Sequence, residues 1–185
     1  MTGYPGKPAG RRQVVLSLGS NLGDRLAQLQ AGVDGLAAVP GLRATAVSSV
    51  YQTSPVGGPE QPDYLNAVLI AVSALPAAAI LGRCQAIERA AGRVRTLRWG
   101  PRTLDIDIVA CDGEVSDDPD LTLPHPRAHE RAFVLVPWHE ADPAAWLPGH
   151  GPVAGLLGAA GTGGVRRLDG PAIRLAIPAT AEEGA

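Results

Sequence analysis

The sequence predicts an α+β fold, in which one antiparallel β-sheet carries helices on one face. The 185 residues are enough for a single domain with its own hydrophobic core. Apolar patterns with periods of 2 and 3.6 follow one another in the order strand, helix, strand, strand, helix, strand. Short segments rich in Pro and Gly separate these patterns and mark the turns between them.

The first half of the pattern begins after a polar segment. Residues 1–12 contain Gly, Pro, Lys and Arg without periodicity, and we expect them to form a flexible tail. The apolar run 14–19 is long enough for a buried strand. A helical pattern covers 22–36, and we expect Asn21 to cap its N-terminus. Residues 42–51 are rich in β-branched and small side chains, which predicts a second strand.

The second half of the pattern begins with a loop at 53–59, which contains two Pro and two Gly residues. Residues 64–72 predict a strand whose alternation places Tyr64 and Asn66 together on one face. Residues 76–91 predict a helix, because Pro suits its first turn and an apolar stripe follows.

A second loop is expected at 92–102 and a further strand at 103–110, whereas 127–138 are compatible with a short helix. This order of elements is the split βαβ or ferredoxin-like βαββαβ layer. We expect one domain over 13–160. A C-terminal extension over 161–185 follows, and we expect its last ten residues to be loosely ordered.

Composition excludes several classes of protein. The net charge of −2 and the seven aromatic residues argue against a nucleic-acid-binding module. No apolar run approaches the roughly 20 residues needed to cross a bilayer. Two cysteines, Cys84 and Cys111, are too few for a metal cluster or a disulfide framework. The only lysine is Lys7, so the chain has no P-loop. We therefore expect a cytoplasmic protein that binds neither nucleic acid nor membrane.

The clearest chemical signal is the block RVRTLRWGPRTLDID at residues 93–107. Four arginines within ten residues precede two carboxylates, Asp105 and Asp107. On a strand these two side chains share a face, with Cα atoms about 7 Å apart. Such a pair suits Mg²⁺, which favours one or two carboxylates together with substrate phosphates. Because arginines bind phosphates through forked hydrogen bonds, the block predicts a Mg–nucleotide site for phosphoryl-type transfer.

Simpler interpretations of these residues stay open at this point. The arginines of a solvated loop could pair with the two aspartates, and Trp99 could pack locally rather than close over a ligand. Gln85 and Glu88, taken alone, would face solvent on the second helix. Tyr64 and Asn66 offer a stacking face and an amide to a flat heterocycle, but would equally suit the core or an edge of the sheet.

Five segments together resemble one known family. They are LGSNL (18–22), YQTSP (51–55), QPDYLN (61–66), the block at 93–107, and LTLPH (121–125). The sequence resembles the 6-hydroxymethyl-7,8-dihydropterin pyrophosphokinases of folate biosynthesis, in order from about residue 14 to residue 145. The resemblance implies the ferredoxin-like fold. It also implies transfer of pyrophosphate from ATP to the pterin hydroxymethyl group, with release of AMP.

The resemblance also implies roles for individual residues. Asp105 and Asp107 would hold two Mg²⁺ ions that bridge the ATP phosphates and the attacking hydroxyl. Arg93 would clamp the phosphates late, as its loop closes, whereas Arg102 would bind them more rigidly. Other implied ATP contacts are Gln85, Glu88, Arg95, Arg98, Trp99, Ile108, Thr122, His125 and Arg131, and the implied pterin contacts are Thr53, Pro55, Gly57, Tyr64, Asn66 and Phe133.

The chain departs from the family pattern at a few positions. The arginine loop is one residue shorter than in some relatives. Pro126 stands where some have Tyr, and Asp120 where some have Arg, so two ATP contacts are in doubt. The main rival is another Mg-dependent nucleotide enzyme on the same layer, such as a nucleotidyltransferase. We expect a monomer whose partners are the small molecules ATP and the pterin.

Overall fold

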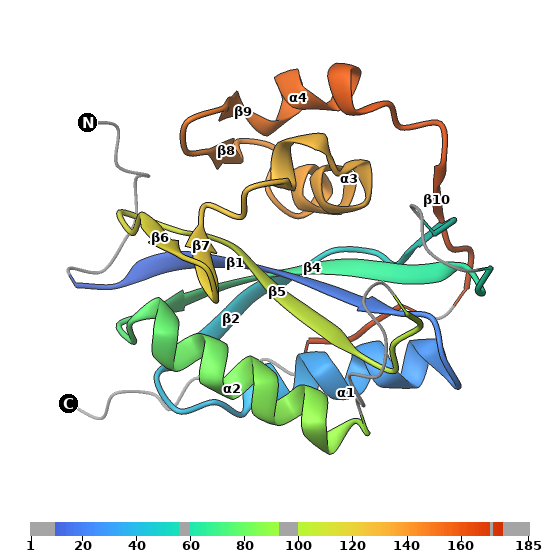
Figure 1. The fold of residues 1–185 in the computed structure, drawn as a ribbon, viewed down its shortest axis with the longest axis horizontal. Coiled ribbons are helices and arrows are strands. Elements are labelled where there is room, and N and C mark those ends of the chain that lie inside the picture. The colour runs from blue at the N-terminus through green and yellow to red at the C-terminus, as the bar shows by residue number, and fades with distance from the viewer. Residues whose placement is uncertain (1–9, 56–59, 93–99, 171, 176–185) are drawn as a thin grey trace, which may run out of the picture.

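The computed structural model describes residues 10–55, 60–92, 100–170 and 172–175. In this part of the chain, a six-stranded sheet lies between two helical layers (Figure 1). Its elements are β1 (Arg12–Ser20), α1 (Arg25–Ala37), β2 (Leu42–Val47), β3 (Tyr51–Thr53), β4 (Tyr64–Ser73), α2 (Ala77–Ala90), β5 (Asp105–Cys111), β6 (Ser116–Asp118), β7 (Leu121–Leu123), η1 (Ala128–Glu130), α3 (Ala132–Ala141), β8 (Trp146–Leu147), β9 (Gly151–Pro152), α4 (Val153–Ala160) and β10 (Val165–Arg167).

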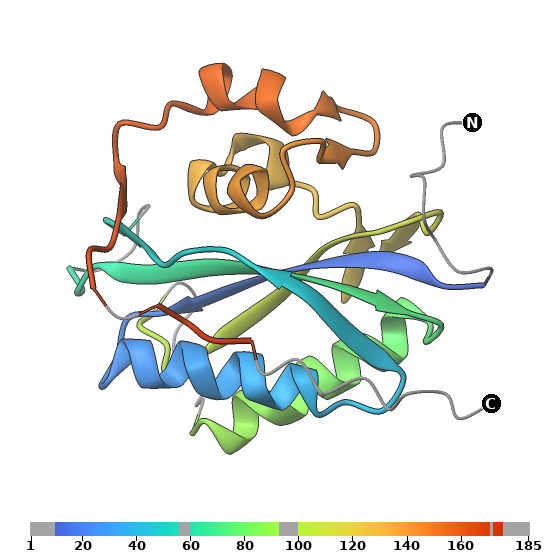
Figure 2. The same cartoon turned by 180° about the vertical axis from the view of Figure 1, so that it is seen from behind.

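The expected ferredoxin-like layer is confirmed, but helices cover both faces of the sheet and not only one as expected (Figure 1). The strands of the main sheet pair in the order β10-β3-β4-β1-β5, with β2 also paired to β4, and all of these pairs are antiparallel. Helices α1 and α2 lie side by side on one face of the sheet (Figures 1 and 2). β1 is an interior strand between β4 and β5, and it is buried on both faces, with Val14, Leu16 and Leu18 in the core beneath the two helices.

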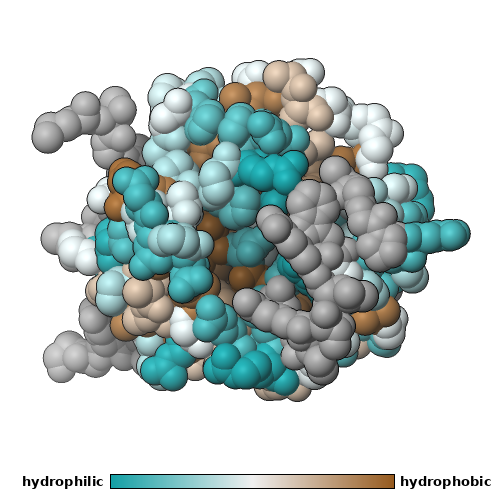
Figure 3. Space-filling view, viewed as in Figure 1, coloured by the Kyte–Doolittle hydropathy of each residue, from teal (hydrophilic) through white to brown (hydrophobic). Residues whose placement is uncertain are grey.

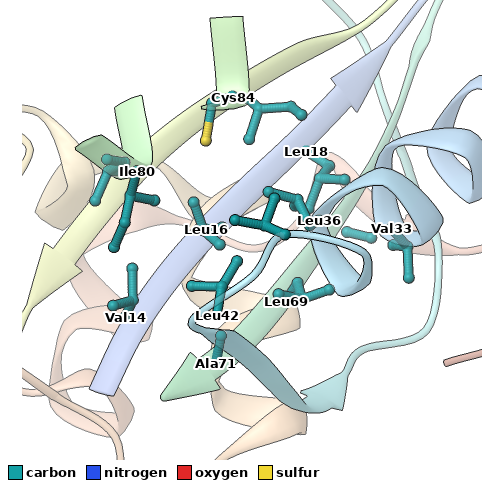
Figure 4. Close-up of a cluster of buried hydrophobic side chains, with 14 of the residues drawn as sticks. Val14, Leu16, Leu18, Val33, Leu36, Leu42, Leu69, Ala71, Ile80 and Cys84 are labelled. Atoms are coloured by element: carbon teal, nitrogen blue, oxygen red, sulfur yellow. The ribbon is translucent and has the colours of Figure 1, made fainter. Parts of the chain in front are cut away.

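The core beneath α1 and α2 follows the sequence periodicity. Figure 4 shows side chains of β1, β4, α1 and α2 meeting in it. From α2 come Ile80 and Cys84, one turn apart on the predicted apolar stripe, and both are fully buried. Gly92 ends this helix region with a φ of +74°, as the sequence predicted. Nowhere in the described ranges is a helix long and apolar enough to span a bilayer.

The opposite face of the sheet carries a second helical layer, built by α3 and α4 (Figure 1). Val134, Leu135 and Trp138 of α3 are buried in a second cluster together with Val68 and Ile70 of β4. The short helix expected at 127–138 is therefore a 3₁₀ turn followed by α3. The sequence analysis did not predict α4, because its Gly- and Ala-rich sequence gives only a weak apolar stripe.

Two local expectations are wrong. Asn21 does not cap α1; the helix begins at Arg25 and its cap is Asp24, whose carboxylate accepts a hydrogen bond from the Ala27 N–H at 3.1 Å. The single strand expected at 42–51 is broken into β2 and β3. At the break, Ser48 and Val68 exchange hydrogen bonds of 2.9 and 3.0 Å, in one of which the Ser48 hydroxyl accepts. Most of the tail expected at 1–12 lies outside the described residues, but Arg12 already belongs to β1.

Two helical glycines provide a matched test of this packing. A Cβ on Gly32 of α1 would lie 2.9 Å from Leu18 Cδ2 and 3.2 Å from Leu104, whereas one on Gly82 of α2 would meet nothing within 4 Å. Ala favours a helix over Gly by about 0.5–1 kcal/mol, so Gly82→Ala should stabilise the protein. Gly32→Ala should destabilise it by about 1–3 kcal/mol, because both leucines are fully buried. Urea denaturation measures both, and equal shifts would contradict this packing.

Candidate active site

A pocket of about 690 Å³ lies between the sheet and the start of α3. Hydrophilic residues border part of the hollow on this side of the molecule (Figure 3). Many of the predicted site residues line the pocket: Thr53, Pro55, Tyr64, Asn66, Arg102, Asp105, Asp107, His125, Arg131 and Phe133. The fold thus brings both ends of the implied site, for phosphate and for pterin, into one cavity.

The floor of the pocket comes from the strand register. Gly19 of β1 lies between Asn66 of β4 and Asp105 of β5. Ser17, two residues earlier on the same face of β1, lies next to Asp107. A Cβ on Gly19 would approach Asn66 Oδ1 to 3.3 Å. Glycine therefore leaves room around this amide. The sequence analysis missed Ser17 and Gly19, because only the pairing of strands distant in sequence places them here.

Asp105 and Asp107 both line the pocket, as their spacing on β5 predicts. Asp105 forms an ion pair with Arg102, and Asp107 Oδ2 lies 3.7 Å from Arg131 Nη1. The pKa of Asp107 is nevertheless raised to about 6, because burial and the negative charge of Asp105 outweigh the two arginines. Ion pairing alone therefore does not balance this pair, which is a suitable environment for a further cation.

Arg131 joins three parts of the pocket. Besides approaching Asp107, its Nη1 lies 3.3 Å from His125 Nε2, and its guanidinium stands 5.5 Å over the Phe133 ring. Burial, followed by the charge of Arg131, lowers the pKa of His125 to about 4. The Nδ1 of this histidine accepts the Arg127 N–H at 3.1 Å. His125 is therefore neutral near pH 7, and the positive charge here belongs to the arginine.

Asn21 connects the two ends of the pocket from beneath. Its Oδ1 accepts the Arg102 N–H at 2.7 Å, and its own N–H donates to the Arg102 carbonyl at 3.0 Å. Its Nδ2 donates to Gln61 Oε1 at 2.9 Å and to the Pro62 carbonyl at 3.2 Å. The Tyr64 hydroxyl donates to the same Gln61 oxygen at 3.3 Å. One amide, 1 % exposed, therefore ties the segment before β5 to the segment before β4.

The other end of the pocket is less charged. Asn66 Nδ2 donates to Thr53 Oγ1 at 2.8 Å, and both residues are buried. Tyr64 and Phe133 are half-buried and line the same cavity, so part of each side chain is accessible from the pocket and is not packed in the core. The wall on this side is formed by residues that the sequence analysis did not single out, namely Ala160, Gly161, Gly164 and Val165.

Several implied contacts do not line this pocket. Glu88, which would face solvent if judged alone, is 4 % exposed and accepts the Ile106 N–H at 2.8 Å. Ile108 is 5 % exposed in the core, and the Thr122 hydroxyl donates to the Asp118 carbonyl at 3.0 Å. Gln85 is half-buried on α2, away from the pocket lining. Gly57, Arg93, Arg95, Arg98 and Trp99 lie outside the described residues.

Comparison with known proteins shows the family to which the chain belongs. Residues 15–143 match the family model of 7,8-dihydro-6-hydroxymethylpterin-pyrophosphokinase (HPPK). A Mycobacterium leprae protein named 2-amino-4-hydroxy-6-hydroxymethyldihydropteridine pyrophosphokinase is 54 % identical over 146 residues, covering 73 % of this chain and 74 % of the relative. A Mycobacterium tuberculosis (strain H37Rv) protein of the same name is 49 % identical over 158 residues, covering 78 % and 82 %.

A crystal structure of Plasmodium falciparum HPPK-DHPS, wild type with STZ-DHP, resembles the fold with a TM-score of 0.61 at 12 % identity. The likeness covers 80 % of this chain and 43 % of that chain. At this identity it supports the fold alone. The family model, by contrast, spans more than half of the sequence, and the two mycobacterial relatives are matched over most of their length. The chain therefore belongs to the 7,8-dihydro-6-hydroxymethylpterin-pyrophosphokinase family and is a transferase of the pyrophosphokinase type.

Proposed function

We propose that this protein transfers pyrophosphate from ATP to the hydroxymethyl group of 6-hydroxymethyl-7,8-dihydropterin in a Mg²⁺-dependent reaction of folate biosynthesis that releases AMP. The observation that carries the proposal is the composition of the pocket described above. One end holds Asp105 and Asp107 with Arg102 and Arg131, and the other end holds an amide and two aromatic rings. A phosphate donor and a flat acceptor therefore fit side by side.

The carboxylate pair fits a divalent cation. Asp105 and Asp107 share a face of β5, and the raised pKa of Asp107 indicates a deficit of positive charge around it. Within the described ranges, no group of three or more His, Cys, Asp or Glu residues could hold a metal ion. The two aspartates would thus hold Mg²⁺ jointly with phosphate and water oxygens. When bound, the metal supplies charge neutralisation for in-line phosphoryl displacement.

The phosphates would be oriented by arginines around these carboxylates. Asn21 forms hydrogen bonds with both the backbone N–H and the carbonyl of Arg102. The backbone that carries this guanidinium is therefore fixed. Arg131 is positioned by the Phe133 ring, which lies 5.5 Å beneath its guanidinium. Because His125 stays neutral, it adds no second positive charge beside this guanidinium. Forked hydrogen bonds from two pre-positioned arginines favour binding of a polyphosphate.

The acceptor would lie in the less charged end of the pocket. The buried Asn66 amide, backed by the Thr53 hydroxyl, can donate and accept at the edge of an amide-like heterocycle. Tyr64 and Phe133 offer ring faces to it. Asn21 holds both ends of the pocket in one geometry, so Arg102 and the segment that leads to Tyr64 are in place before either substrate binds.

The direct test is a turnover assay with ATP, Mg²⁺ and 6-hydroxymethyl-7,8-dihydropterin. Release of AMP with the pyrophosphorylated pterin supports the proposal. Formation of ADP would indicate transfer of a single phosphate. Release of pyrophosphate would indicate that the protein is a nucleotidyltransferase instead. If ATP is turned over at the same rate without the pterin, the pterin is not the acceptor.

Replacing either carboxylate should abolish turnover. In Asp105→Asn or Asp107→Asn, one negative charge for the cation is lost while the shape is kept, and we expect kcat to fall at least about a hundredfold. The fold should survive, because the change also removes like-charge repulsion. Asp117→Asn, at an exposed aspartate of β6, is the matched control. Near-normal activity of either site variant at saturating Mg²⁺ would contradict the metal assignment.

Phe133→Ala should weaken pterin binding more than ATP binding, because stacking on a flat ring is lost. Aromatic stacking contributes on the order of 1 kcal/mol beyond buried area, which corresponds to about a fivefold change in Kd. Phe133→Leu, which keeps apolar volume but not the ring, should show most of the same loss. Calorimetric titration with each ligand decides the matter, and equal losses for both ligands would mean that Phe133 acts through the core or through Arg131 and not by stacking on the pterin.

Alanine substitution of Arg93 and of Arg102, both before β5, should change different binding and kinetic constants. Arg102→Ala should weaken ATP binding itself, because its backbone is fixed in the free protein. By the family resemblance, Arg93 acts only as its loop closes, so Arg93→Ala should lower kcat and leave the Kd for ATP nearly unchanged. Equilibrium titration and steady-state kinetics separate these effects. Loss of ATP affinity at normal kcat in Arg93→Ala would make it an ordinary phosphate contact.

A further inference from the structure

The C-terminal strap, defined here as residues 160–170 and 172–175, runs from the end of α4 through β10 to the surface of α1. Figure 2 shows it as the orange-to-red trace that passes the β3 edge of the sheet and continues alongside α1. The strap lies wholly beyond residues 15–143, which match the family model. Its role in the pocket is therefore a property of this chain that the family match does not describe.

The strap borders one end of the pocket only. Its residues Ala160, Gly161, Gly164 and Val165 line the cavity, and Val165 pairs with Thr53 of β3. Thr53 in turn accepts the hydrogen bond from Asn66. In the strand order β10 and β5 stand at opposite ends, with three strands between them. The strap therefore adjoins the amide end of the pocket and lies away from the two aspartates.

The strap is held at the end of β10 and beyond it. Arg167 Nη2 donates to Ser49 Oγ at 2.7 Å, and the Leu168 N–H donates to the Val50 carbonyl at 2.8 Å, both in the segment between β2 and β3. Farther along, Ile173 is 6 % exposed in the core under α1 and α2. The Gln30 amide of α1 donates to the Arg174 carbonyl at 2.8 Å and accepts its N–H at 2.9 Å. These attachments follow the wall in the sequence, and Val165 is the wall residue that pairs directly with the sheet, opposite Thr53, so this end of the wall is fixed.

Gly164 is the position where this wall can be altered without disturbing the fold. A Cβ added there meets no heavy atom within 4 Å, and its φ lies outside the positive region that disfavours side chains. Gly163 has the same two properties but does not line the pocket. The two neighbouring glycines therefore form a matched pair, one at the wall and one beside it.

We propose that the C-terminal strap is the fixed outer wall of the acceptor end of the pocket, and that Gly164 determines how large an acceptor fits there. This inference rests on the function proposed above. The strap acts on the flat heterocycle that carries the reacting hydroxyl, whereas the polyphosphate donor binds at the other end. A side chain at Gly164 narrows the acceptor end and leaves the phosphate end unchanged.

The experiment compares Gly164→Ala, Gly164→Val and Gly164→Leu with the control Gly163→Leu in the full chain. We expect the KM for the pterin to rise with the size of the side chain, on the order of tenfold for Leu, because a clash at a specificity wall discriminates by size. The KM for ATP should stay within about twofold in every variant. Gly163→Leu should behave as the wild type, and thermal denaturation confirms that each variant is folded.

The inference is overturned if Gly164→Leu keeps the wild-type pterin KM, if it raises the KM for ATP equally, or if Gly163→Leu has the same effect. Should Gly164→Leu not fold, the smaller Ala and Val variants still give the trend. The wild type serves as the separate test of function, because a wild type that releases no AMP contradicts the proposed reaction. In that case the pterin Kd, measured by calorimetry for the same variants, tests the role of the strap without reference to turnover. A pterin Kd that is the same in all variants would overturn the inference.

Discussion

Two like charges on one face of an end strand determine how the rest of the site is built. Asp105 and Asp107 point from β5 into a cavity, where neither is fully hydrated and each raises the energy of the other. Arg102 and Arg131 approach them from the pocket. From the opposite face of the sheet, the buried Glu88 accepts the Ile106 N–H between them. Among the described residues, β5 pairs with a main-sheet strand on one side, at β1, so this contact gives its other edge a hydrogen-bond partner and holds the carboxylates in place.

The second requirement is that donor and acceptor meet in one geometry. The two halves of the pocket are carried by different strands and by segments that are distant in the sequence. Asn21 bridges them through a fully satisfied amide beneath the floor, and a buried polar group satisfied in this way gives a defined arrangement. Gly19, near Asn21 on the same chain segment, leaves space beside the Asn66 amide, which a Cβ there would approach to 3.3 Å. Rigid positioning of this kind is what phosphoryl transfer demands of a protein.

The sequence predicted those parts of the molecule that depend on local periodicity. The alternation of β4 and β5 placed Asn66, Asp105 and Asp107 on the correct face, and the stripe of α2 placed Ile80 and Cys84 in the core. It did not predict features created by contacts between distant segments. Asn21 and Asp24 are both good helix caps, and only the tertiary hydrogen bonds of Asn21 decide between them. Nothing in the local sequence around Ser17 or Gly164 indicates a place in the pocket. Ser17 is brought there by the pairing of β1 with β5, and Gly164 by the course of the strap.

The central claim is that Asp105 and Asp107 jointly hold divalent cations against the phosphates of the donor. Anomalous diffraction from crystals grown with Mn²⁺, a non-hydrolysable ATP analogue and the pterin tests it most directly. The account predicts metal peaks between the two carboxylates and the phosphate chain, coordinated by both aspartates. Metal bound to the phosphates alone, with Asp105 and Asp107 still paired to Arg102 and Arg131, would contradict it.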